Sequence, residues 1–124
     1  MRRHPVYLIP TLLLSASVLA APSPVKVEVL QTKLDHPWSL AFLPADQGML
    51  VTLRGGQLRH WQAGKGISDP IVGVPRVWAN GQGGLLDVVL APDFAQSRRV
   101  WLSYAEVGND GKAGTAVGYG RLTD

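Results

Sequence analysis

Hydrophobic residues fall into short runs or alternate with polar residues along this chain, and glycine, proline, asparagine and aspartate separate the groups. Alternating valines predict a half-buried first strand over residues 25–30. Apolar runs over 38–43 and 49–53, followed by alternation over 57–61, predict a hairpin and a third strand. Residues 116–122 also have a strand-like pattern. Because no helical period is found in this part of the chain, the pattern predicts an all-β fold.

Two stretches of the sequence repeat. Residues 40–44 align with 88–92 at an offset of 48, and residues 49–53 align with 100–104 at an offset of 51. Repeats of about 40–50 residues with several strands each are typical of β-propellers, whose small antiparallel sheets, or blades, surround a central channel. Chance similarity between short apolar strands is the alternative. We interpret the repeat as the first about two blades of a β-propeller, which needs roughly four to eight blades to close, so we expect a fragment of a longer protein.

The N-terminus predicts a secretory signal peptide over residues 1–20, followed by an incomplete propeller domain over 21–124. The chain begins with the basic residues Arg2 and Arg3, continues with an apolar stretch over 6–19, and has small residues at the expected cleavage site. That stretch is shorter than the roughly 20 residues of a membrane span, and no stop-transfer charges follow it. We therefore expect a periplasmic protein without a stable membrane anchor.

Composition and charge exclude several functions. With 46% hydrophobic and 17% charged residues, the chain is too apolar for a disordered protein. The absence of cysteine excludes disulfides, thiolate nucleophiles and cysteine-ligated metals. The formal charge is +3, but without Arg2 and Arg3 ten basic residues face nine acidic ones. This balance gives no electrostatic basis for nucleic-acid binding.

The glycine-rich stretch around Gln82 is the strongest candidate site. Gly81, Gly83 and Gly84 allow a sharp turn and a close approach to a ligand, while the carboxamide of Gln82 offers both hydrogen-bond donors and an acceptor. The residues alone favour a flexible turn over a ligand contact. A dinucleotide-binding reading fails, because Leu86 occupies the place of the third glycine and no helix follows.

Other chemistry-bearing residues favour structural roles. Asp87 is a lone carboxylate, whereas a hard cation needs several oxygen ligands. We expect His36 and His60 to be structural or exposed, because neither has a spaced carboxylate or second histidine. The pair Arg98–Arg99 is expected to be an exposed loop pair. The four tryptophans are expected to pack between blades; they are Trp38, Trp61, Trp78 and Trp101.

Four motifs in order, at 36–44, 81–88, 91–94 and 100–104, resemble the N-terminal part of the soluble sugar dehydrogenases that depend on pyrroloquinoline quinone (PQQ). The resemblance implies a six-bladed propeller with PQQ in the channel mouth and a calcium ion that polarises a quinone carbonyl. It also implies that a histidine takes the proton of the C1 hydroxyl of an aldose while hydride passes to PQQ, which gives a lactone and later requires an electron acceptor.

Residue by residue, the resemblance assigns only Gln82, as a contact to PQQ. The catalytic histidine, the arginine and the calcium ligands of the family lie in later segments, so we assign no catalytic and no metal-binding residue and expect the chain alone to be inactive. Two alternatives from other classes stay open. One is an exported β-propeller that only binds a carbohydrate or a protein, and the other is a small exported β-sandwich that acts in adhesion.

Overall fold

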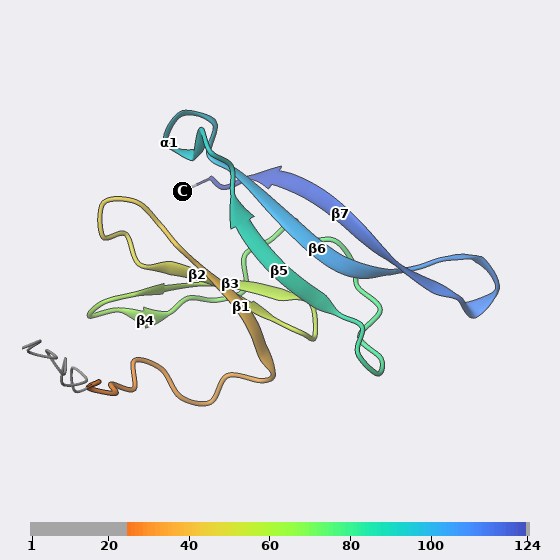
Figure 1. Cartoon of the computed structure of the whole chain (residues 1–124), viewed down its shortest axis with the longest axis horizontal. Coiled ribbons are helices and arrows are strands. Elements are labelled where there is room, and N and C mark those ends of the chain that lie inside the picture. Colours follow the sequence, from red (N-terminus) through yellow and green to blue (C-terminus); the bar gives the residue numbers. More distant parts are fainter. Residues whose placement is uncertain (1–24, 124) are drawn as a thin grey trace, which may run out of the picture.

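The computed structural model describes residues 25–123, which form two antiparallel sheets (Figure 1). The first sheet contains four strands in sequence order, β1 (Pro37–Phe42), β2 (Met49–Leu53), β3 (Gln57–Gln62) and β4 (Gly66–Ile67). Each strand therefore pairs only with its neighbours in the sequence. The short β4 was not predicted, because two residues are too few to give a periodic signal.

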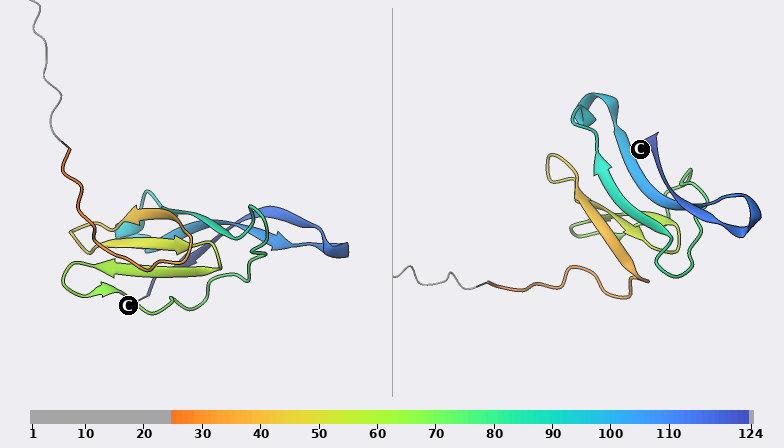
Figure 2. Two further views of the ribbon diagram at one scale, coloured as in Figure 1. Left: turned by 90° about the horizontal axis from the view of Figure 1, so that it is seen from below. Right: turned by 45° about the vertical axis from the view of Figure 1, so that its right-hand side comes forward.

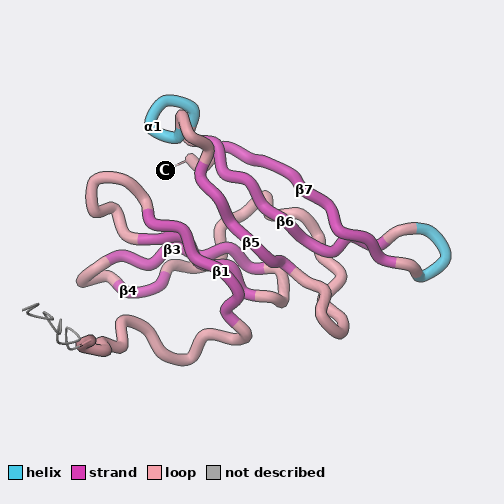
Figure 3. The backbone as a smooth tube through the Cα atoms, viewed as in Figure 1, coloured by secondary structure: helices cyan, strands magenta, loops and turns pink. Residues whose placement is uncertain are grey.

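The second sheet contains β5 (Leu85–Leu90), β6 (Arg99–Val107) and β7 (Ala113–Arg121), again in sequence order. A single helical turn, α1 (Phe94–Ser97), connects β5 to β6, and a short 3-10 helix, η1 (Asn109–Gly111), lies between β6 and β7. A long loop without regular structure joins the two sheets (Figure 3). Both sheets are thus meanders, in which the chain turns back on itself without a crossover.

Glycines make the tight turns of the first sheet possible. Gly56 closes the turn between β2 and β3 with a positive φ of 107°, and its N–H donates to the carbonyl of Leu53 at 2.9 Å. Gly48, just before β2, also has a positive φ, and a Cβ there would lie 2.0 Å from the carbonyl oxygen of Trp61. No other residue fits either position without strain.

The main hydrophobic core lies between the two sheets. Leu50 and Leu85 are fully buried at its centre. The buried members of this core are Leu43, Leu50, Leu58, Leu85, Val88, Phe94, Val100, Leu102 and Tyr104. A smaller cluster on the opposite face of β2 consists of Met49, Val51 and Leu53, against which Leu34 and Trp61 pack. As a result, every residue of β2 is buried.

β5 is the strand of the second sheet that lies against β1 and β2 (Figures 1 and 2). The N–H of Leu85 donates to the carbonyl of Arg54 at 2.9 Å, and the Thr52 hydroxyl donates to the carbonyl of Leu86 at 2.6 Å. The Ser39 hydroxyl, on β1, donates to the carboxylate of Asp87. These bonds tie the first strand of the second sheet to the two leading strands of the first.

The topology agrees with the predicted repeat. β1 and β5 contain most of the aligned stretches 40–44 and 88–92, and each is the first strand of its sheet. β2 and the aligned part of β6 are each the second strand. The additional residues of the second copy form α1, the only α-helix among residues 25–123.

The strand predicted over residues 25–30 is wrong. This segment has no regular structure, and Val25, Val27 and Val29 are 89%, 85% and 72% exposed. The alternation satisfies only the side chains, whereas a strand also needs a partner for its backbone groups. No strand among residues 25–123 pairs with this segment.

The prediction that Arg98 and Arg99 form an exposed loop pair is also wrong. Arg98, in a left-handed conformation at the end of α1, lies half-buried over the ring of Phe94, and Arg99 begins β6 with its guanidinium over the ring of Tyr119.

The predicted signal peptide, residues 1–20, lies outside the described residues. Within residues 25–123, no helix has the length and hydropathy needed to cross a membrane.

Candidate functional site

Gln82 lies at the tip of a tight turn that precedes β5. We call residues 80–84 the glycine loop. The N–H of Gly83 donates to the carbonyl of Asn80 at 2.8 Å, which closes the turn, and Gly81 takes a positive φ of 55°. Gln82 is exposed at this tip. The loop therefore presents a carboxamide to solvent just before the chain enters the second sheet.

The first anchor of the glycine loop is Arg54, at the end of β2. Its Nη1 donates to the carbonyl of Gly81 at 2.6 Å. Its own backbone carbonyl accepts the N–H of Leu85 at 2.9 Å, and its N–H donates to the carbonyl of His36 at 3.0 Å. One residue thus connects the segment before β1, the end of β2 and the start of β5.

The second anchor comes from β6. The carbonyl of Ala105 accepts the N–H of Trp78 at 2.8 Å, and its N–H donates to the carbonyl of Gly84 at 2.8 Å. A Cβ on Gly83 would lie 2.6 Å from the carbonyl oxygen of Trp78. On Gly84, whose φ is 144°, it would lie 2.2 Å from the carbonyl oxygen of Arg54. Both positions require glycine, so the loop is a tightly packed element rather than a flexible linker.

The side chain of Gln82 is free to bind a ligand. It makes no hydrogen bond to any other residue of 25–123. A primary carboxamide carries two N–H donors, and these suit a ligand whose carbonyl and carboxylate oxygens accept hydrogen bonds. PQQ, which the sequence resemblance implies, belongs to this class of ligand, and the donor set of Gln82 fits it.

Asp87 has a structural role in this arrangement. Its Oδ1 accepts from the Ser39 hydroxyl and from the N–H of Val88, and its own N–H donates to the Ser103 hydroxyl at 3.0 Å. The carboxylate therefore links β1 and β5, as part of the contact between the sheets. Residues 25–123 contain no group of three or more His, Cys, Asp or Glu side chains that could hold a metal ion. Calcium does not fit the donor set of the described residues.

The imidazoles of the two described histidines, His36 and His60, have hydrogen-bond partners outside the glycine loop. The Nδ1 atom of His36 lies 2.6 Å from the carboxylate of Asp35, and both side chains are exposed. The sequence analysis missed this carboxylate, because it is adjacent in the chain rather than spaced. On β3, the Nε2 atom of His60 lies 2.7 Å from the carbonyl of Gln47. Neither imidazole has a contact with the glycine loop.

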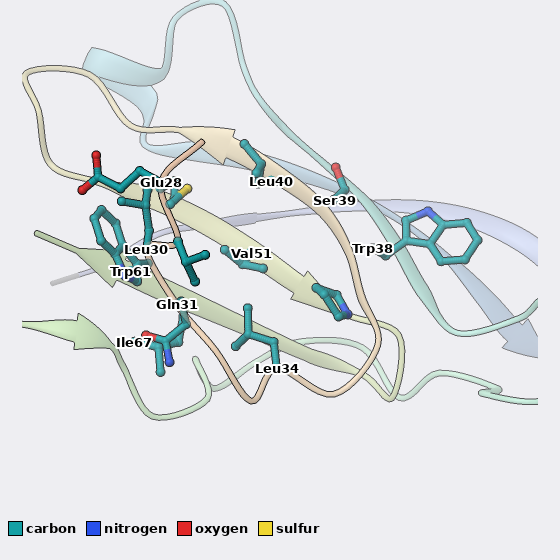
Figure 4. Close-up of a pocket in the computed structure, with 13 residues that line it drawn as sticks. Glu28, Leu30, Gln31, Leu34, Trp38, Ser39, Leu40, Val51, Trp61 and Ile67 are labelled. Atoms are coloured by element: carbon teal, nitrogen blue, oxygen red, sulfur yellow. The ribbon is translucent and has the colours of Figure 1, made fainter. Parts of the chain in front are cut away.

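An apolar cavity lies between residues 28–34 and the outward face of the first sheet (Figure 4). Its volume is about 500 Å³, and Leu40, Val51 and Trp61 are among its lining residues. Trp38 also lines it but is 50% exposed, so this tryptophan does not pack between sheets in the described structure. Most of its lining residues are apolar, and Glu28 is the one lining residue with a carboxylate, which makes the cavity a poor candidate for acid–base catalysis.

Sequence reasoning missed Arg54 as part of the site. The triplet Arg54–Gly55–Gly56 lies at the turn between the strands predicted over 49–53 and 57–61. Nothing in it indicates a contact with Gly81, 27 residues away. Trp78 contacts the loop through its backbone and ring.

Comparison with known proteins identifies the family of this chain. Residues 34–124 match the family described as glucose/sorbosone dehydrogenase. Aldose sugar dehydrogenase YliI from Escherichia coli K12 is 73% identical over 124 residues, which cover 100% of this chain and 33% of that protein. The crystal structure of the soluble aldose sugar dehydrogenase from Escherichia coli, in its apo form, aligns with a TM-score of 0.77 and 82% identity over 78% of this chain and 28% of that one.

A more distant structure is the PQQ-bound form of an aldose sugar dehydrogenase from Streptomyces coelicolor. It aligns with a TM-score of 0.53 and 26% identity over 73% of this chain and 26% of that one. The match covers the whole of this chain but only 33% of the length of the Escherichia coli enzyme. The two sheets described above correspond to part of these larger structures. The chain belongs to the glucose/sorbosone dehydrogenase family.

Proposed function

We propose that this chain is the N-terminal part of a PQQ-dependent, calcium-requiring dehydrogenase that oxidises aldose sugars at C1 to lactones. The match to an aldose sugar dehydrogenase over the whole chain and the PQQ-bound form of a relative support the proposal. In this proposal, residues 1–20 are a signal peptide that directs the protein to the periplasm. Residues 21–124 are the first blades of an incomplete β-propeller domain.

Gln82 is the cofactor-binding residue of this chain in the proposal. The observation that carries it is the exposed carboxamide, without a partner among residues 25–123, at the tip of an anchored loop. When bound, PQQ supplies a two-electron acceptor for the hydride of the sugar. Gln82 holds and orients the cofactor through its N–H donors and its carbonyl oxygen. We place neither the proton acceptor nor a calcium ligand on residues 25–123.

The strand order supports a propeller over a sandwich. Both sheets pair strands strictly in sequence order. Immunoglobulin-like sandwiches instead use Greek-key connections, in which the chain crosses between the sheets. Propeller blades are successive antiparallel sheets of about four strands each, arranged around one axis. An exported propeller that only binds a ligand has the same topology, and only a functional test separates it from the enzyme.

Cofactor binding by the gene product that carries this chain tests the proposal. The apoprotein is titrated with PQQ in the presence of calcium, and binding is followed by tryptophan fluorescence and by the absorption of the quinone. We expect saturable binding and glucose-dependent reduction of an artificial electron acceptor. Replacing Gln82 by alanine should weaken PQQ binding about tenfold, because one ligand-facing hydrogen-bonding group is lost.

Gln96→Ala is the matched control, because Gln96 is also an exposed glutamine but lies on α1. It should leave PQQ binding unchanged. An unaltered dissociation constant in Gln82→Ala would remove Gln82 from the cofactor site. A gene product that neither binds PQQ nor oxidises any aldose would favour the binding or adhesion alternative.

A further inference from the structure

Arg54 holds the backbone of the glycine loop at the residue before Gln82. Its guanidinium Nη1 donates to the carbonyl of Gly81 at 2.6 Å. The donor is a cation, and hydrogen bonds from ionised donors are shorter and stronger than those between neutral groups. This contact spans 27 residues of sequence and joins the first sheet to the tip of the loop.

The main chain of Arg54 is itself fixed on two sides. Its N–H donates to the carbonyl of His36 at 3.0 Å, and its carbonyl accepts the N–H of Leu85 at 2.9 Å. Gly84 packs so closely on this carbonyl that a Cβ would lie 2.2 Å from the oxygen. The guanidinium therefore extends from a rigid base, at the end of a strand that is buried along its whole length.

The tip of the loop is more open than its base at Gly83 and Gly84. Nothing lies within 4 Å of the position that a Cβ would take on Gly81, whose φ is 55°. The turn bond from Gly83 to Asn80 and the contact from Arg54 are the hydrogen bonds that fix this tip among the described residues. Without Arg54, only the local turn bond would restrain the direction of the Gln82 side chain.

We propose that Arg54 is a positioning residue, which orients Gln82 for the cofactor through the carbonyl of Gly81. This inference rests on the proposed function for the identity of the ligand. Arg54 acts through the loop and not by direct contact with the quinone. Its loss should loosen the loop and weaken cofactor binding together, which a purely structural arginine would not do.

The test compares Arg54→Met with Arg59→Met in the gene product that carries this chain. Arg59, on β3, is a matched control, because its Nε donates to a backbone carbonyl, that of Ser68, at 2.7 Å. Amide hydrogen exchange is measured at Gly83 without cofactor. The PQQ dissociation constant and the absorption spectrum of bound PQQ are measured at saturation. Arg54→Lys, which keeps the charge, is prepared as a milder variant.

In Arg54→Met we expect about tenfold faster exchange at Gly83, about tenfold weaker PQQ binding and a shifted spectrum of the bound quinone. Arg59→Met should leave all three unchanged. Arg54→Lys should give smaller changes in the same direction, and it decides the matter if Arg54→Met does not fold.

Weaker PQQ binding with unchanged exchange at Gly83 would overturn the inference, because Arg54 would then act on the ligand directly. Unchanged binding and spectrum would overturn it as well. If the unaltered protein binds no PQQ, the proposed function fails by itself. The exchange measurement then still decides whether Arg54 positions the loop, because it needs no cofactor.

Discussion

Thr52 shows how one side chain joins the two sheets. It is completely buried, and its Oγ1 accepts the N–H of Ser39 at 3.0 Å and donates to the carbonyl of Leu86 at 2.6 Å. A buried hydroxyl is favourable only when its hydrogen bonds are made. Here the hydroxyl satisfies backbone groups on β1 and β5 at once, so the residue serves the contact between the sheets more than the β2 ladder.

Replacing Thr52 by valine should destabilise the fold. Valine keeps the shape but leaves the Leu86 carbonyl and the Ser39 N–H without this partner, which costs about 1–3 kcal/mol in the free energy of unfolding. Urea denaturation of the gene product that carries this chain measures the change. Thr115→Val, on the exposed part of β7, makes the same substitution without buried partners and should stay within about 0.5 kcal/mol. Equal effects at the two sites would contradict the role given to Thr52.

Gly84→Ala should damage the glycine loop. The substitution places a Cβ 2.2 Å from the carbonyl oxygen of Arg54, at a φ of 144° that alanine rarely adopts. We expect a loss of at least about 2 kcal/mol in the free energy of unfolding. Gly55→Ala is the control, because nothing lies within 4 Å of its Cβ position. Thermal denaturation of the two variants of the gene product that carries this chain checks this, and a harmless Gly84→Ala would show that the loop can rearrange.

At the level of elements, β2 is the centre of the structure. One face packs into the core between the sheets, and the other faces Leu34 and Trp61. β1, beside it, has no fully buried residue. Ser39 and Ala41 on one face are half-buried, and Trp38, Leu40 and Phe42 on the other are at least half exposed. Adjacent strands of one sheet thus differ strongly in how much apolar surface they remove from water.

Leu50→Ala and Leu40→Ala should therefore differ in their cost. Leu50 is 0% exposed, so its truncation leaves a cavity and should cost about 2–5 kcal/mol. Leu40 is 50% exposed, and its truncation should cost about 1 kcal/mol. The comparison uses the free energy of unfolding of the gene product that carries this chain. Similar costs would mean that the outward face of β1 is covered in the protein as it occurs.

Some elements were predictable because their signal is local. The limits of β2 follow from five consecutive apolar or β-branched residues between a glycine and the Arg54–Gly55–Gly56 turn. The strand predicted over 25–30 failed because alternation says nothing about a pairing partner. In the site, the glycine spacing predicted the turn around Gln82, and the family resemblance assigned Gln82 to the cofactor. Arg54 was not, because its contact with Gly81 exists only after the two sheets have packed.

At the scale of the whole molecule, apolar side chains are exposed on the outer side of each sheet. On the first sheet this face contains the outward residues of β1. On the second it contains Val89, Val117 and Tyr119, which are 52%, 66% and 67% exposed, and Trp101, whose ring lies 4.9 Å from that of Tyr119. The two faces are the outer sides of a two-layer arrangement. Large exposed apolar faces of this kind mark contact surfaces in soluble proteins.

The chain of 124 residues, produced alone, should show neither enzyme activity nor a sharp thermal transition. Two sheets with open faces lack the neighbours that repeat architectures need for cooperative stability. With added PQQ, calcium, glucose and an artificial acceptor, dye reduction should not exceed that of a control without protein. Circular dichroism on heating checks the second expectation. A cooperative transition together with dye reduction would show that these residues form a complete enzyme.

The strict sequence order of the strands has a consequence for how the protein forms during synthesis. Each ladder joins neighbouring segments, so each sheet closes only short loops, and such local pairing is kinetically fast. The first sheet can pair as soon as β4 has left the ribosome. The face of that sheet that contains Leu50 stays exposed to water until Leu85 and the rest of β5 follow. Between those two moments the nascent chain exposes an apolar surface, and in that interval it is most prone to aggregation.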